Sequence, residues 1–188
     1  MKQFLDYLNY ITPLTEDAQS AIIAKLKKAK YHKGEILIKE LSKCEHLFFI
    51  EKGLVRAYYF KDAKEITDWF GLKNGVIGPV IRHFPTKTGT HSVKLLEDTT
   101  VIFISFYDLQ ELYDKYHEIE CLDRLDAIQT ILLLQQKIDS IQFLTAKQRY
   151  RDFVKAYPTL LNRVSLGYIA SYLGMNQVTL SRIRKVTS

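Results

Sequence analysis

Cysteine is scarce in this chain, and its two thiols stand far apart in the sequence. Cys44 and Cys121 are the only cysteines among 188 residues, and neither belongs to a C-x-x-C pair. Two cysteines are too few for the disulfide framework of a small secreted domain, and also too few for an iron-sulfur cluster held by four thiolates. We therefore expect both cysteines to be reduced thiols.

Long apolar segments are missing as well. No run approaches the roughly 18 uninterrupted apolar residues that a membrane span requires. The first residues, MKQFLDYLNYITPLTED, are polar and acidic where a secretory signal would be apolar. Hydrophobic residues make up 47% of the chain and charged residues 26%, which is enough apolar material for a packed core. These observations predict a cytoplasmic protein with no membrane partner.

Motifs for catalysis and metal binding are also absent from the sequence. The chain has no glycine-rich phosphate loop, no G-x-S-x-G elbow and no H-E-x-x-H helix. The histidines are scattered without the i, i+4 spacing of a metal site; they are His32, His46, His83, His91 and His117. The sequence therefore predicts a protein that is not an enzyme and that holds no metal or cofactor.

Charge is distributed unevenly along the chain. The formal net charge is +6, yet residues 145–188 alone contain eight Lys and Arg residues and a single Asp. The other 144 residues contain 19 basic and 20 acidic residues, so they are close to neutral. Such an asymmetry is typical of a near-neutral module joined to a module that meets a polyanion such as nucleic acid.

The first region, to about residue 114, is predicted to be mainly β-structure after a short helical lead-in. The stretch LTEDAQSAIIAKLKKAKYHK has apolar residues four positions apart behind Thr15, which can act as an N-cap, and this predicts an amphipathic helix. Short apolar runs separated by Gly and Asp follow, and they favour an all-β sandwich or roll: GEILIKE, HLFFIEKG, LVRAYYF, EITDWF, GVIGPVI, HSVKLL and TVIFISF. Most Tyr and Phe residues fall at core positions of these runs, which favours core packing over stacking on single-stranded nucleic acid.

The second region is predicted to be a long helix. There is no glycine or proline between Asp108 and Pro158, and apolar residues from Ile119 to Ile141 fill more than one helical face. A helix of about 20 to 25 residues with two apolar sides needs two packing partners. One partner is its own domain. A second copy of the helix in a homodimer is the favoured second partner, and burial inside a monomer is the alternative.

The last region has the pattern of a helix-turn-helix. TAKQRYRDFVKAYP predicts a capped helix that ends at Pro158, and the segment from Leu166 to Ile183 follows it. Its seam positions are apolar or small, Gly174 stands in the turn, and Ser165 and Asn176 precede the two short helices as N-caps. Side chains of the second helix that avoid this seam would face a DNA major groove, and the alternative is a pair of packed helices with a solvated basic face.

The order of these segments resembles that of the cyclic AMP receptor protein/FNR (Crp/Fnr) family of bacterial transcription regulators. The resemblance is carried by YHKGEILI, HLFFIEKGLVRAYY, LLEDTTVIFISFYDL, FLTAKQR and VSLGYIASYLGMNQVTLSRIRK, which span nearly the whole chain. It implies an α+β fold: a β-roll sensor domain of the cyclic-nucleotide-binding type (a double-stranded β-helix, residues 1–115), a dimerisation helix (116–143) and a helix-turn-helix DNA-binding domain (144–188). It also implies a homodimeric transcription regulator that reads a pseudo-palindromic operator in double-stranded DNA, with RNA polymerase as a further candidate partner.

The resemblance places candidate DNA contacts on and beside the second short helix. Base-reading positions correspond to Gln177, Val178 and Arg182, and phosphate or groove contacts correspond to Ser165, Thr179 and Ser181. Asn176, Arg184 and Lys185 complete the candidate DNA-binding residues. The family often has an acidic residue where this chain has Val178, so a different preferred base sequence is expected. Because the chain stops at Ser188, we expect most of the β-hairpin wing of the family to be missing.

The sensor region departs from the relatives that bind cyclic AMP. Those relatives use a Gly-Glu pair and, about ten residues later, an Arg. The corresponding residues here are Gly78-Pro79 and Gly89-Thr90, with His91 beside them. Pro79 cannot accept a bond from a ribose hydroxyl and Gly89 supplies no cation for a phosphate. We therefore expect no control by cyclic AMP, and either an unknown small-molecule effector or none.

Three further features of the sequence bear on this assignment. Arg82 and Lys87 are alternative cations for the sensor region, although a solvated loop is the favoured place for both. Leu41 stands where the family has a turn glycine. The alternative function is a cupin-like ligand-binding β-roll or small enzyme without a DNA role, and it leaves the basic C-terminal region unexplained.

Overall fold

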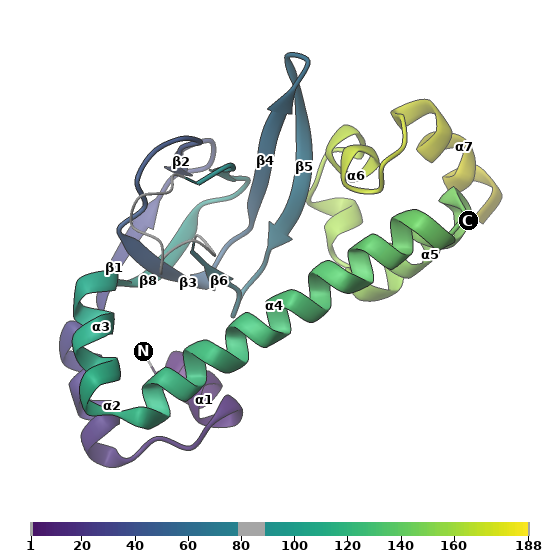
Figure 1. The fold of residues 1–188 in the computed structure, drawn as a ribbon. Coiled ribbons are helices and arrows are strands. Elements are labelled where there is room, and N and C mark those ends of the chain that lie inside the picture. Colours follow the sequence, from purple (N-terminus) through teal and green to yellow (C-terminus); the bar gives the residue numbers. More distant parts are fainter. Residues whose placement is uncertain (1, 79–88, 188) are drawn as a thin grey trace. The chain divides into compact units, whose positions relative to one another are not determined.

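The structure, a computed structural model, describes residues 2–78 and 89–187 (Figure 1). Its helices and strands are α1 (Lys2–Ile11), α2 (Glu16–Lys25), β1 (Lys27–Tyr31), β2 (Ile36–Ile38), β3 (His46–Lys52), β4 (Val55–Lys61), β5 (Lys64–Gly71), β6 (Val76–Ile77), β7 (Ser92–Leu95), β8 (Thr99–Ser105), α3 (Phe106–Lys115), α4 (His117–Phe143), α5 (Ala146–Ala156), the 3-10 helix η2 (Leu160–Asn162), α6 (Leu166–Tyr172) and α7 (Gln177–Thr187). They divide into two compact units. Unit 1 contains Met1–Ala57 and Phe70–Gln129, and unit 2 contains Tyr58–Trp69 and Thr130–Ser188.

Two four-stranded sheets form the β-structure that the short apolar runs predicted. One sheet has the strand order β1-β8-β3-β6 and the other has the order β2-β7-β4-β5. In the first sheet β8 runs antiparallel to both β1 and β3, with Phe103 opposite Lys27 and Phe48. Every side chain of β8 is buried or half-buried, as expected for a strand that is covered on both faces. Order and composition of the strands therefore agree with the predicted roll.

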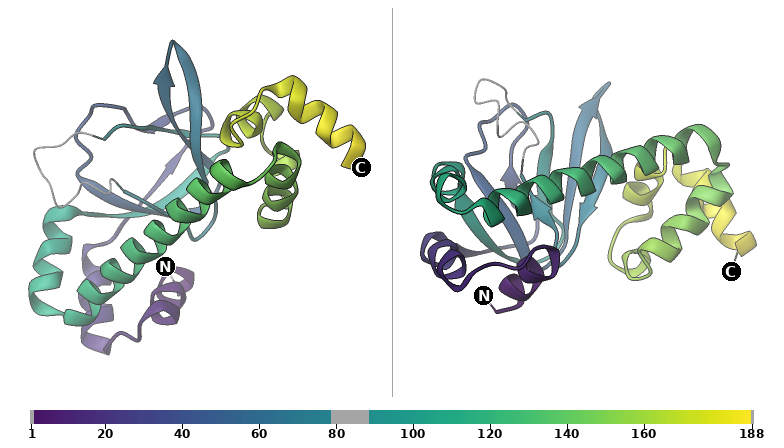
Figure 2. Two further views of the ribbon diagram at one scale, coloured as in Figure 1. Left: turned by 45° about the vertical axis from the view of Figure 1, so that its right-hand side comes forward. Right: turned by 60° about the horizontal axis from the view of Figure 1, so that its bottom comes forward.

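Helices cover one face of the β1-β8-β3-β6 sheet in unit 1 (Figure 2). Phe4 and Leu8 of α1 are buried there together with Ile22 of α2, Leu109 of α3 and Ile119 of α4. The ring of Phe4 meets the ring of Phe49 edge-on, with centroids 4.7 Å apart. This α1 contribution was not identified in the sequence, where the first residues look polar as a group.

The helix predicted for LTEDAQSAIIAKLKKAKYHK is correct only in its first part. Thr15 caps α2 by accepting a hydrogen bond from the amide of Ala18, as predicted. The helix ends at Lys25, however, and Lys27–Tyr31 is strand β1 rather than helix. Its residues pair antiparallel with β8. The prediction was wrong here because pairing with a strand about 70 residues later overrides the local helical pattern.

Unit 2 is mainly helical. Thr145 and Gln148 form a reciprocal capping box at the start of α5, which confirms the predicted cap of that helix. The β4–β5 hairpin turns through Asp62 and Ala63, whose φ values of 50° and 58° are those of a two-residue turn of the I′ type. Its outer residues Tyr58–Trp69 belong to the same compact unit as α5, α6 and α7.

The long helix α4 has 27 residues, slightly more than the length predicted from the sequence. Its first turns bury Ile119 and Leu122. The apolar side chains farther along are between 44% and 75% exposed: Ile128, Ile131, Leu132, Leu133, Leu134, Ile138, Ile141 and Phe143. Among the described helices, α4 included, none combines the length and apolar character needed to cross a bilayer.

Candidate nucleic-acid interface

Helices α6 and α7 are joined by the tight turn that the sequence predicted. Gly174 has φ +64°, in the left-handed region that glycine adopts without steric cost. The amide of Met175 donates to the carbonyl of Ala170 at 3.0 Å, and the amide of Gly174 donates to Ser171 at 3.2 Å. These bonds satisfy the last carbonyl groups of α6 and fix the direction in which the chain leaves it.

The seam between the two helices is apolar and buried. Three side chains from α6 and the residue that ends it are at most 5% exposed: Ile169, Ala170 and Leu173. Leu180 of α7 is completely buried. Phe153 of α5 belongs to the buried residues of the same unit. Four of the seam positions deduced from the sequence are thus buried as a helix-turn-helix requires. The seam residues Leu166, Met175 and Ile183 are half-buried.

Both short helices begin at the predicted caps. The Oγ of Ser165 accepts from the amide of Tyr168 at 3.3 Å, and the Oδ1 of Asn176 accepts from the amide of Thr179 at 2.7 Å. The two capping side chains are exposed. Their oxygen atoms are already used as caps, so a contact with a ligand would be made by their remaining polar groups or by neighbouring amides.

The exposed face of α7 lies opposite its buried seam. A helix turns by about 100° per residue, so Val178, Arg182 and Lys185 all point within about 40° of the direction opposite Leu180. These three side chains are exposed, and Val178 is 61% exposed although it is apolar. This face combines two cations with an apolar group and is available to a partner.

The other candidate contacts of α7 occupy different positions. Gln177 is exposed at the start of the helix, and its Oε1 lies 3.3 Å from where a Cβ would stand on Gly167. Thr179 and Ser181 are half-buried. Arg184 is about 40° from Leu180 around the helix, at the edge of the packed face, and it interacts within the protein.

One basic residue of the C-terminal region has a structural role that the sequence did not reveal. Arg149 of α5 donates from Nε to the carbonyl of Leu173 at 2.9 Å and from Nη1 to the carbonyl of Leu144 at 2.7 Å. It therefore joins the end of α6 to the residue that follows α4. The sequence alone does not distinguish an arginine that donates to two carbonyl groups within the protein from one that is exposed and can bind a phosphate.

Strand β5 of the β4–β5 hairpin contacts α6 within unit 2. The amide of Thr67 donates to the Oγ of Ser171 at 2.9 Å, and that Oγ reaches the carbonyl of Glu65 at 3.5 Å. Thr67 is 2% exposed. These residues are more than 100 positions apart in the chain, so no local pattern could have indicated that they meet.

A second polar contact joins the same hairpin to α4. The Nζ of Lys137 forms an ion pair with the carboxylate of Asp68 and donates to its carbonyl at 2.8 Å. It also lies 5.6 Å from the ring centre of Tyr172. Burial is the main reason why the pKa of Tyr172 lies well above its usual value, and the neighbouring Tyr157 and Asp68 raise this pKa further.

The predicted sensor pocket in unit 1 is only partly described. A Cβ on Gly78 would lie 2.6 Å from Cδ1 of Leu47, so this position has no room for a side chain unless Leu47 moves. The carbonyl of Gly89 accepts from the amide of Leu41, and Thr90 Oγ1 lies 2.9 Å from Nδ1 of His91. Leu41 adopts φ +62° and thus takes the conformation that the family's turn glycine would have.

Four residues named from the sequence lie outside the described part of the chain. They are Pro79, Arg82, His83 and Lys87. Within residues 2–78 and 89–187, the structure contains no group of three His, Cys, Asp or Glu side chains arranged to hold a metal ion.

Comparison with known proteins bears on residues 28–116 and on the fold. Residues 28–116 match the family described as the cyclic nucleotide-binding domain. No curated protein matches the sequence. FixK2 from Bradyrhizobium japonicum has a similar structure with a TM-score of 0.73 and 19% sequence identity, covering 85% of this chain and 83% of FixK2.

Two further solved structures are similar over most of their length. The c-di-GMP responsive global regulator CLP from Xanthomonas campestris has a TM-score of 0.70 and 16% identity, covering 92% of this chain and 91% of CLP. A structure from Eubacterium rectale, described as that of a transcriptional regulator of the Crp/Fnr family, has a TM-score of 0.74 and 15% identity, covering 96% and 87%. One of these neighbours is thus described as a Crp/Fnr regulator, and the predicted α+β fold is confirmed.

Proposed function

We propose that this chain, whose residues 28–116 match the cyclic nucleotide-binding domain and whose fold is that of Crp/Fnr regulators, is a sequence-specific DNA-binding regulator of transcription. It acts in the cytoplasm as a homodimer without control by cyclic AMP. The observation that carries this proposal is the exposed face of α7, where Val178, Arg182 and Lys185 stand opposite the buried Leu180.

The chemistry of this face suits a major groove. Arg182 can pair with guanine through two hydrogen bonds, Gln177 can pair with adenine, and the exposed Val178 can contact a thymine methyl group. Lys185 would neutralise a phosphate rather than read a base. Ser165, Asn176, Thr179, Ser181 and Arg184 surround this face as further candidates for phosphate or groove contacts.

The second half of α4 is suited to pairing with a second copy. Ile131, Leu134, Ile138 and Ile141 follow the 3-4-3 spacing of coiled-coil seam positions, and each is about half exposed in the single chain. Ile131 and Leu134 have the β-branched residue followed by leucine that favours two-stranded coiled coils, whereas the next repeat has Ile141 at its second seam position. A dimer with two-fold symmetry would present two α7 helices to half-sites about one helical turn apart.

The residues of the sensor region support the proposed absence of control by cyclic AMP. Gly78 is confined by Leu47, and Gly89 provides no cation for a cyclic phosphate. The structural neighbour CLP is named as responsive to c-di-GMP, so a fold of this kind can work with an effector other than cyclic AMP. We propose an unidentified small-molecule effector or none, and RNA polymerase as a further partner.

DNA selection tests the proposal most directly. Duplexes retained from a random library should contain a pseudo-palindrome with half-sites about 10 base pairs apart. Arg182→Ala should weaken binding to the selected duplex by about 1–3 kcal/mol and relax base choice at one position of each half-site. Lys185→Ala should instead weaken binding to all sequences equally. Equal losses on all duplexes for both variants would contradict the assignment of Arg182 as a base-reading residue.

Dimerisation and effector choice need separate measurements. Ile138→Lys should convert the dimer to a monomer in sedimentation experiments, whereas Gln135→Lys, an exposed change of equal charge on the same helix, should not. Calorimetry with cyclic AMP should give no heat of binding. A monomeric native chain would refute the dimer, and micromolar binding of cyclic AMP would refute the proposed loss of its control.

A further inference from the structure

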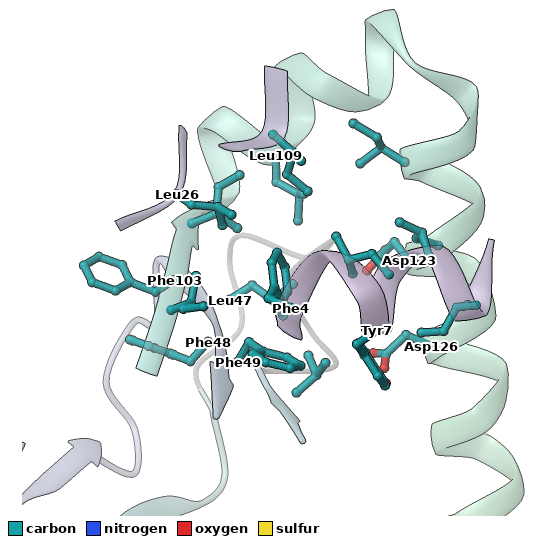
Figure 3. Close-up of a pocket in the computed structure, with 18 of the residues that line it drawn as sticks. Phe4, Tyr7, Leu26, Leu47, Phe48, Phe49, Phe103, Leu109, Asp123 and Asp126 are labelled. Atoms are coloured by element: carbon teal, nitrogen blue, oxygen red, sulfur yellow. The ribbon is translucent and has the colours of Figure 1, made fainter. Parts of the chain in front are cut away.

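An apolar cavity of about 80 Å³ lies in unit 1 between α1, one face of the β1-β8-β3-β6 sheet and the first turns of α4 (Figure 3). Phe4 and Leu8 of α1, Phe49 of β3, Ile104 of β8 and Ile119 of α4 are among its lining residues. Each of these five side chains is at most 8% exposed. Protein interiors have few voids larger than a water molecule, so a space of this size is unusual in a packed core.

The lining makes water a poor occupant of this cavity. Among the described residues that line it, only Tyr7, Tyr113, Asp123 and Asp126 have polar side chains. Asp123 and Asp126 already interact within the chain, so they offer a guest no uncommitted charge. A buried water molecule needs several polar partners, whereas cavities lined by Leu, Ile and Phe stay dry and take up apolar guests such as benzene. The cavity is therefore suited to an apolar guest.

Aromatic rings form part of the cavity wall. The ring centroids of Phe4 and Phe49 are 4.7 Å apart at an interplanar angle of 64°, and the ring of Tyr7 lies 5.4 Å from that of Phe49. Figure 3 shows these three rings close together between α1 and the sheet. A further ring can pack on them in the edge-on or offset arrangements that aromatic pairs prefer. The wall thus favours an aromatic guest over an aliphatic guest of the same size.

We propose that this cavity binds a small uncharged aromatic compound of about five to eight non-hydrogen atoms. The size follows from the volume, because a water-sized sphere occupies roughly 10–15 Å³ on the same scale. The lack of charge follows from the lining, because an ionic group would lose its hydration there without gaining an uncommitted counter-charge. The ring of the guest would lie against Phe4 and Phe49.

This site is separate from the predicted nucleotide pocket. Gly78, Gly89, Thr90 and His91, the described residues of that pocket, are not among the cavity's lining residues. The inference is also independent of the proposed DNA-binding function, because every lining residue belongs to unit 1. Failure of DNA binding would leave it standing, and failure to bind an aromatic compound would leave the DNA proposal standing.

Nuclear magnetic resonance of isoleucine methyl groups can test the site in the full chain. Ile104 and Ile119 line the cavity, whereas Ile50 is buried in unit 1 without lining it. Toluene should shift the signals of Ile104 and Ile119 but not those of Ile50, with a millimolar or tighter dissociation constant. Benzylammonium should bind at least tenfold more weakly than toluene, and methylcyclohexane at least twofold more weakly. Binding of either compound as tightly as toluene, or no shift with toluene near its solubility limit, would overturn the proposal.

Variants locate the guest in this cavity. Leu8→Phe puts a larger side chain into the space and should abolish toluene binding. Leu5→Phe makes the same change on α1 at a half-buried residue outside the lining, and it should keep the native affinity within about twofold. Methyl signals of Ile50 at their native positions show that a variant is folded, and if Leu8→Phe does not fold, Leu109→Phe fills the cavity from α3 instead. A folded filling variant that binds toluene as the native chain does would overturn the proposal.

Discussion

Replacement of Gly174 by alanine should lower the free energy of unfolding of unit 2. The loss should come only from the left-handed backbone conformation at this position. Gly174 has φ +64°, and a Cβ built on it meets no atom within 4 Å, so no steric contact would contribute. An L-residue in the left-handed region costs about 1–2 kcal/mol. Alanine recovers roughly 0.4–1 kcal/mol of this by restricting the unfolded chain. The mid-range values give an expected net loss of about 0.8 kcal/mol.

Urea unfolding followed by fluorescence can measure this loss. Trp69 is the only tryptophan of the chain and belongs to unit 2. Gly174→Asn should lose less stability than Gly174→Ala, because asparagine tolerates the left-handed region better. Gly167→Ala, inside α6, is the matched control and should be neutral or stabilising by up to about 1 kcal/mol. If Gly174→Ala were as stable as the native chain, or less harmful than Gly174→Asn, the turn would not depend on the left-handed conformation.

Two other substitutions test the cap and the buried phenol of unit 2. Asn176→Ala should lower the free energy of unfolding by about 0.5–2 kcal/mol, measured in urea, because the amide of Thr179 loses its acceptor. The raised pKa of Tyr172 means that the folded state keeps the phenol proton when the unfolded chain, with a pKa of about 10, releases it. The buried phenol therefore contributes fully to the free energy of unfolding below about pH 10. Above that pH the contribution declines by at most about 1.4 kcal/mol per pH unit. In Tyr172→Phe, urea unfolding measured at a series of pH values should not show this decline.

The fold could be predicted wherever a local pattern and its long-range partners agree. The N-caps could be predicted because a cap and its helix are neighbours in the sequence. They are Thr15, Thr145 and Ser165. The turn at Gly174 was visible because glycine in that position supplies a backbone conformation that few other residues tolerate. The buried seam around Leu180 followed from helical spacing alone.

Prediction failed where a distant partner decides the outcome. Lys27–Tyr31 continues a helical pattern, yet it becomes a strand because β8 offers it a ladder of hydrogen bonds. The bond between Thr67 and Ser171 joins segments that have no shared motif. Asp126 and Tyr7 come together only because α1 packs beside α4, and nothing in the first residues marks that packing.

Arg149 shows why a count of basic residues overestimates the charge available to DNA. Its guanidinium bonds the carbonyls of Leu173 and Leu144, so Arg149→Ala should cost about 1.5–3 kcal/mol of stability. Arg151→Ala removes an exposed charge from the same helix and should stay within about 0.5 kcal/mol.

DNA binding gives the complementary measurement. Each cation that neutralises a phosphate contributes about 0.9 to the slope of log K against log salt concentration. Lys185→Ala should therefore flatten the slope by about that amount, whereas Arg149→Ala should leave the slope unchanged in conditions where the variant is folded. A flatter slope for Arg149→Ala with unaltered stability would mean that its guanidinium binds phosphate, and the carbonyl contacts would then be incidental.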